Sequence, residues 1–256
     1  MMRGLLALFI CFCALAFQGP APAQSPVSPF HDWAAVVIAG DTRASGGGTT
    51  QAFENARRDV AASLLHAGFA PANLRTLSLA AAAAPADRTT PDNLFAALHE
   101  TARKAPGGCL LYLTSHGSPR GVVFGEALLT PRLLDSVLQS ACQDRPTVVF
   151  ISACYSGVFV PALAAPNRML LTAARRDRTS FGCGEDDRYP FFDACVLQAW
   201  PQSSDFLALG AAVRGCVDRR EQAMNLKPPS EPQISAGGRI RPLLPLLILP
   251  GGRPTG

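Results

Sequence analysis

The stretch CLLYLTSHGSP, residues 109–119, passes abruptly from apolar to small and polar residues. Its apolar part predicts a buried strand, and the part from Ser115 onward predicts a loop. The stretch TVVFISACYSG, residues 147–157, repeats this pattern. Between them, a helical pattern begins at Thr130 and Pro131, an N-cap residue followed by a proline at the first helical position. Strand, helix and strand in this order predict two parallel strands joined by a crossover helix.

The alternation of strands and helices continues on both sides of these stretches. Further strands are predicted over residues 34–40, 74–79 and 169–172, and further helices over 51–66, 91–104, 191–200 and 206–219. A small hairpin is expected over residues 122–129, a loop over 227–238 and a terminal strand over 243–249. The pattern predicts one α/β domain over residues 34–249, with a mainly parallel sheet and helices on both faces.

The first 23 residues carry one early charge, Arg3, then an apolar run and then Ala21, Pro22 and Ala23. This order predicts a signal peptide over residues 1–23. The apolar run is shorter than the roughly 20 residues that span a bilayer, so a membrane anchor is the weaker alternative. We expect a flexible N-terminal segment over residues 24–33, no stable membrane span in the mature chain, and export to the periplasm or secretion.

Composition and motifs exclude several classes of protein. The net charge of +4 comes from scattered arginines, which argues against a nucleic-acid partner. The sequence has no glycine-rich phosphate loop, no cysteine and histidine spacing typical of zinc sites, and no GxSxG elbow of serine hydrolases. No cofactor and no metal ion are predicted.

His116 and Cys154 each follow the end of a predicted strand, where reactive groups of parallel α/β sheets collect. A thiol with a pKa of about 8.5 needs a base to become the nucleophilic thiolate, and histidine supplies one. The backbone N–H groups of Gly117 and Cys154 are candidates for binding the oxyanion. The pair predicts acyl transfer, against the alternative that Cys154 is a small buried hydrophobe. The other histidines lie in the N-terminal segment or on predicted helices: His31, His66 and His99.

The blocks at residues 111–118 and 150–157 resemble the two active-site blocks of legumain-type cysteine peptidases. The resemblance extends roughly from Ala34 to Asp193. It implies a caspase-like three-layer sandwich, a polypeptide substrate, and His116 and Cys154 as the catalytic dyad. The expected function is a cysteine endopeptidase that forms a thioester acyl-enzyme. A transpeptidase with the same intermediate and a catalytically inactive binding protein are the alternatives.

The chain departs from this family at positions that, in the family, form the pocket for asparagine. Asp41 and Thr42 stand where legumains have an asparagine just after the first strand. Thr49 and Thr50 stand where they have arginine and histidine, and Ser152 stands where they have glutamate. Strict asparagine specificity is therefore not carried over. The resemblance implies that Ser180, in the pocket-wall segment 179–183, and Asp193 contact substrate together with Ser152. Alternatively, Asp193 is the N-cap of the following helix.

Six cysteines remain after the predicted signal peptide. If Cys154 stays a thiol, at most two disulfides can form and one further thiol is left. The first expected bridge joins Cys183 to Cys195 or Cys216, and the second joins Cys109 to Cys142.

Overall fold

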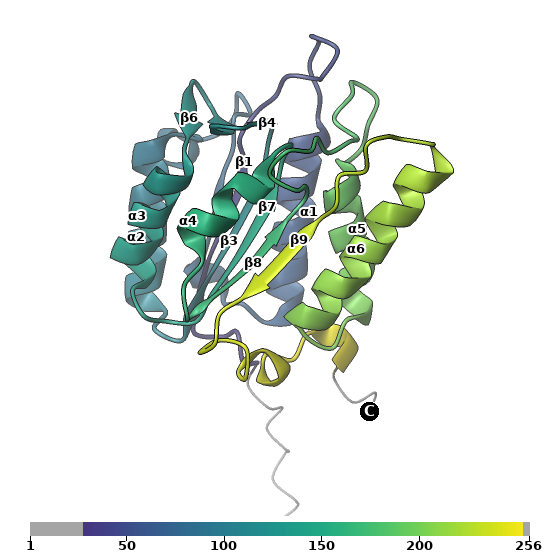
Figure 1. Ribbon diagram of the computed structural model, residues 1–256. Helices are drawn as coiled ribbons and strands as arrows, with labels where there is room; N and C mark the ends of the chain where they lie inside the picture. Colours follow the sequence, from purple (N-terminus) through teal and green to yellow (C-terminus); the bar gives the residue numbers. More distant parts are fainter. Residues whose placement is uncertain (1–27, 253–256) are drawn as a thin grey trace, which may run out of the picture.

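The computed structural model describes residues 28–252. Within them, six strands form the main sheet in the order β2-β1-β3-β7-β8-β9 (Figure 1). Five are mutually parallel and β9 is antiparallel to β8. The strands are β1 (Trp33–Ala39), β2 (Leu74–Leu77), β3 (Gly108–Thr114), β7 (Thr147–Ser152), β8 (Arg168–Thr172) and β9 (Gln233–Ala236).

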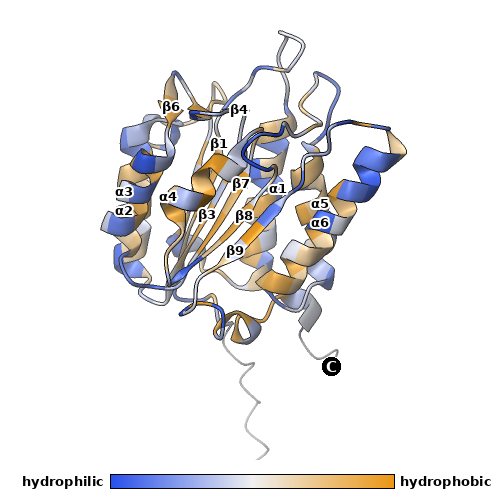
Figure 2. Ribbon diagram, in the orientation of Figure 1, coloured by the Kyte–Doolittle hydropathy of each residue, from blue (hydrophilic) through white to orange (hydrophobic). Residues whose placement is uncertain are grey.

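Helices cover both faces of this sheet. On one face lie α1 (Ala52–Ala67), α5 (Phe191–Ala199) and α6 (Phe206–Ala223). On the other lie α2 (Pro91–Lys104), α3 (Pro131–Cys142) and the short α4 (Val160–Leu163). Each side has its own apolar cluster, and Figure 2 shows hydrophobic strands between helices whose outer faces are largely hydrophilic. This confirms the predicted three-layer sandwich.

The predicted helix starts are formed by the expected side chains. The hydroxyl of Thr90 accepts a hydrogen bond from Asn93 N, and that of Thr130 accepts one from Leu133 N. A proline follows each threonine at the start of the helix, where its missing N–H costs nothing. These caps fix where α2 and α3 begin.

A second, three-stranded sheet lies beside the end of β3. It consists of β4 (Gly117–Ser118), β5 (Gly121–Phe124) and β6 (Ala127–Leu129), all antiparallel. The predicted hairpin over residues 122–129 corresponds to β5 and β6. Val123 N donates to His116 O at 2.9 Å, so this sheet supports the loop that carries His116.

Three expectations about chain segments differ from the structure. The loop predicted over 227–238 contains β9, and the strand predicted over 243–249 is a 3₁₀ turn, η5 (Leu244–Leu246). Pro242 and Pro245 remove backbone donors that a strand would need. The described part of the N-terminal segment is packed, because Phe30 is fully buried and stacks on Phe69 at a centroid distance of 4.9 Å. The predicted signal peptide and residues 24–27 lie outside the described residues.

The chain has two disulfides within the described residues, Cys109–Cys142 and Cys195–Cys216. The predicted number of bridges and the Cys109–Cys142 pairing are confirmed, but the expected bridge from Cys183 is wrong. Cys195 and Cys216 face each other between α5 and α6, which leaves Cys183 a free thiol together with Cys154. None of the helices in the described part of the chain is long and apolar enough to cross a membrane.

Candidate active site

The register of two parallel strands brings the loops that carry His116 and Cys154 next to each other. Thr114 at the end of β3 pairs with Ser152 at the end of β7, and Ser115 N donates to Ser152 O at 3.0 Å. Each candidate residue follows its strand by two positions. A Cβ atom at Gly117 would lie 1.9 Å from the carbonyl oxygen of Cys154, which shows how closely the two loops pack. Gly117 is therefore required by this backbone contact, whatever the substrate needs.

The imidazole of His116 is held by a backbone carbonyl. Its Nε2 lies 2.8 Å from Arg43 O, in the loop after β1, and its ring packs edge-on against Phe53 of α1 at 5.1 Å. A carbonyl oxygen only accepts, so Nε2 carries the proton of this hydrogen bond. In the neutral ring, Nδ1 is left as the proton acceptor, which is what a general base requires. The sequence does not reveal this role of Arg43, because its backbone and not its side chain makes the contact.

Cys154 lies at a sharp turn between β7 and the 3₁₀ turn η3 (Ser156–Phe159). Tyr155 adopts a left-handed conformation with φ of 57°, which is uncommon for a large residue and is often found at functional sites. Tyr155 N donates to Arg178 O at 2.7 Å, whereas the N–H of Cys154 has no acceptor among residues 28–252. That N–H is therefore free to bind an oxyanion.

The thiol of Cys154 is in contact with Ser180. Ser180 N donates to Sγ at 3.2 Å, and Ser180 O and Oγ lie 3.5 and 3.6 Å from Sγ. Ser180 thus lies beside the candidate nucleophile, and its contact with substrate stays a prediction. Within the described residues no hydrogen bond joins Cys154 to His116. Hydrogen bonds between catalytic groups are often long in the absence of substrate and shorten when it binds.

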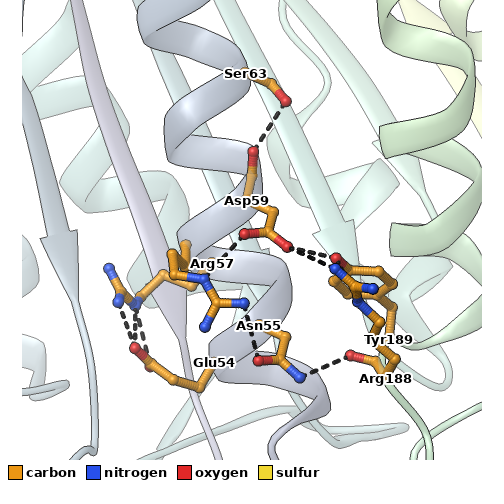
Figure 3. Close-up of polar contacts among 8 residues, drawn as sticks. Glu54, Asn55, Arg57, Asp59, Ser63, Arg188 and Tyr189 are labelled. Atoms are coloured by element: carbon orange, nitrogen blue, oxygen red, sulfur yellow. Dashed lines mark hydrogen bonds and ion pairs between the residues drawn. The ribbon is translucent and has the colours of Figure 1, made fainter.

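The segment that carries Ser180 is anchored to α1 and to the loop after β1. Asn55 Nδ2 donates to Arg188 O at 3.2 Å, and Tyr189 OH donates to the carboxylate of Asp59 (Figure 3). Thr50 Oγ1 donates to Gly184 O at 2.8 Å. These contacts connect the two loops that border the candidate site.

Asp193 lies beneath the site, on the first turn of α5. It is fully buried and accepts hydrogen bonds from Thr114 Oγ1 at 2.8 Å, Ser152 Oγ at 2.7 Å and Tyr112 OH. Burial raises the pKa of Asp193 to about 6, although these three hydrogen bonds act to lower it. The N-cap of α5 is Pro190, so the alternative reading of Asp193 as the cap is wrong.

Ser152 and Asp193, two of the predicted substrate contacts, form the floor of the candidate site. Both side chains are buried and bonded to each other, below the surface that a substrate would touch. The structure shows them joining β3, β7 and α5 directly under the turn of Cys154. Their contact with substrate stays a prediction.

Residues 104–211 match the Peptidase C13 family. The matched range contains the candidate pair as well as Ser180 and Asp193. No curated protein matches the chain.

Among solved structures, the chain is similar to caspase-1 from Spodoptera frugiperda, with a TM-score of 0.58 and 14% sequence identity. The alignment covers 86% of this chain and 93% of the caspase chain. At this identity the similarity shows the fold, which is caspase-like. The Peptidase C13 match and the fold together support a cysteine peptidase.

Cys183, the second free thiol, differs from Cys154 in its surroundings. Burial, and then the neighbouring charge of Cys154, raise the pKa of Cys183 to about 11. At neutral pH it is protonated and a poor nucleophile. Within residues 28–252, no group of three or more His, Cys, Asp and Glu side chains is arranged to hold a metal ion.

Proposed function

We propose that this chain is a cysteine-type endopeptidase in which Cys154 is the nucleophile and His116 the general base. The observation that carries the proposal is the register of β3 and β7, which pairs Thr114 with Ser152, so that the loops of His116 and Cys154 start from neighbouring strand ends. The hydrogen bond from His116 Nε2 to Arg43 O supports it, because it leaves Nδ1 as the basic nitrogen.

In the proposed reaction, the thiol proton passes from Cys154 to His116 Nδ1, and the thiolate attacks the carbonyl carbon of the substrate peptide bond. The N–H of Cys154, with Gly117 N–H as a second candidate donor, stabilises the oxyanion of the tetrahedral intermediate. His116 then donates its Nδ1 proton to the leaving amine. Water, activated by the same nitrogen, hydrolyses the resulting thioester and restores the thiol.

When it attacks, Sγ of Cys154 leaves its contacts with Ser180 and approaches the substrate carbonyl carbon. Ser180 and the segment around it are the substrate-binding wall of the proposed site, since they lie directly against Sγ. Ser152 and Asp193 form the floor under Cys154 and support its turn. They also bind any substrate group that reaches this floor.

The test is covalent labelling with a peptidyl acyloxymethyl ketone, which is directed at active-site thiols. Mass spectrometry is expected to find the adduct on Cys154 at pH 6–7 and to find Cys183 unmodified, because its raised pKa keeps it protonated. His116→Ala should lose the adduct. Equal labelling of both thiols, or no labelling of Cys154, would favour the inactive binding protein.

We also propose that the protein works after export, in the periplasm or as a secreted protein. The two disulfides support this, since such bridges persist in oxidising compartments. Mass spectrometry of the exported protein should find an N-terminus near Gln24. Exported protein that retains Met1 would contradict cleavage after Ala23.

A further inference from the structure

Asp41 is a buried carboxylate at the end of β1 that the proposed reaction does not yet use. Its side chain is only 5% exposed. Oδ1 accepts hydrogen bonds from Thr42 N at 2.8 Å and Arg43 N at 3.1 Å. The guanidinium of Arg43 binds the same carboxylate through Nε at 3.0 Å and Nη2 at 2.9 Å. One carboxylate therefore holds both the backbone and the side chain of Arg43.

Arg43 is also the residue whose carbonyl accepts the hydrogen bond from His116 Nε2. The peptide bond that follows is fixed at its other end, because Ala44 N donates to Gly48 O at 2.8 Å. Thr50 N donates to Thr42 O at 2.9 Å and closes the loop behind the turn. Among residues 28–252, Asp41 is the side chain at the end of β1 that holds residue 43, and it thereby fixes the direction of the Arg43 carbonyl.

We propose that Asp41 is a positioning residue, which orients the Arg43 carbonyl so that it selects the Nε2–H tautomer of His116. This inference rests on the proposed cysteine peptidase function. Through that tautomer Asp41 keeps Nδ1 available to the thiol of Cys154. Because the Arg43 carbonyl is already held in place, it need not reorient to stabilise the positive charge that forms on the imidazole.

Asp41 stays ionised over the working range of a neutral peptidase. Burial acts to raise its pKa, but the hydrogen bonds from Arg43 and Thr42 and the charge of Arg43 outweigh this and lower it. The hydrogen bond and the charge of Asp41, and then the charge of Glu126, raise the pKa of the Arg43 guanidinium. The Arg43 side chain is 64% exposed, so the carboxylate rather than this ion pair is the fixed part of the turn.

The experiment compares Asp41→Ala, Asp41→Glu and Asp41→Asn in the mature protein. Asp41→Ala and Asp41→Glu should lower kcat by about tenfold or more with little change in KM, because the general base is mispositioned. Asp41→Asn keeps an oxygen that can accept from both backbone N–H groups, and should recover most of the loss. Asp144→Asn is the matched control, since it breaks an Asp–Arg pair on an exposed surface residue.

Two further readouts separate positioning from a merely structural role. The rate of Cys154 alkylation at pH 7 should fall in Asp41→Ala and Asp41→Glu, because the thiol loses its correctly placed base. In ¹⁵N-histidine spectra, His116 should change from one Nε2–H tautomer to a mixture. Asp41→Glu serves if Asp41→Ala does not fold.

The inference would be overturned if Asp41→Glu kept the wild-type tautomer of His116, the wild-type alkylation rate of Cys154 and the wild-type kcat. It would also be overturned if kcat fell in the variants only in proportion to their loss of thermal stability. Cys154→Ala is assayed alongside. If it is inactive while the Asp41 variants behave like wild type, the peptidase proposal stands and only the role of Asp41 fails. If Cys154→Ala were fully active, the peptidase proposal itself would fail.

Discussion

At the scale of single residues, Gly117 shows how tightly the candidate site is built. An added methyl group would lie 1.9 Å from Cys154 O, so one of the two loops must move. We expect Gly117→Ala to destabilise the protein by about 1–3 kcal/mol. It should also lower kcat/KM by about 100-fold, because the reacting groups are displaced. Peptide hydrolysis and urea unfolding measure the two effects.

The control for this variant is Gly238→Ala. No atom lies within 4 Å of a Cβ built at Gly238, so this substitution should change stability by less than about 0.5 kcal/mol. If both variants behaved alike, the close contact between Gly117 and Cys154 O would be wrong.

Asp193 predicts a pH dependence of stability. Its pKa of about 6 in the folded protein lies above the ordinary value of 3.8, so the folded state binds more protons than the unfolded state between these values. Stability is therefore highest below the unfolded pKa and falls as the pH rises through about 6. A pKa difference of about 2 corresponds to roughly 3 kcal/mol.

Asp193→Asn removes this titration. Relative to wild type, its free energy of unfolding should rise by up to about 3 kcal/mol between pH 4 and pH 7, as measured by urea denaturation at each pH. Asp144→Asn, at a carboxylate that is 91% exposed, should show no comparable change. If the free energies of unfolding of Asp193→Asn and wild type differed by the same amount at all pH values, the raised pKa of the buried Asp193 carboxyl would be contradicted.

At the scale of elements, the disulfide Cys195–Cys216 ties α5 to α6 across a sequence separation of 21. Closing a loop of this length in the unfolded chain is worth about 3 kcal/mol. We expect the double variant Cys195→Ala/Cys216→Ala to lose about this much stability in urea unfolding. Cys183→Ala, which removes a free thiol, should lose much less. Equal losses, or peptide mapping that finds Cys183 in a bridge, would disprove this pairing.

Elements with a strong local pattern could be predicted from the sequence, and β9 could not. β3 and β7 are continuous apolar runs that end in small residues, so their bounds and their parallel pairing follow from the sequence. β9 has the sequence QISA, and it is a strand because it pairs with β8. That pairing is a tertiary effect that no local pattern contains. For the same reason, the sequence does not reveal that the side chains of Ser152 and Asp193 are buried against each other.

For the whole molecule, the arrangement of the loops bears on specificity. Thr50 binds Gly184 O and Ser152 binds Asp193, so both positions hold the site together where legumains carry charged pocket residues. We therefore expect a peptide-library profile without a strict requirement for asparagine at the cleavage position, and with polar or cationic residues accepted. A profile dominated by asparagine alone would contradict this.

The proposed peptidase reaction requires Cys154 and His116 to act as one catalytic unit. The most direct measurement is the rate of peptide hydrolysis by Cys154→Ala, His116→Ala and the double variant, using a substrate from the library profile. Each single variant should be inactive with a stability change of about 1 kcal/mol or less, and the double variant should be no worse, because neither residue works without the other. Full hydrolysis by Cys154→Ala would contradict the account.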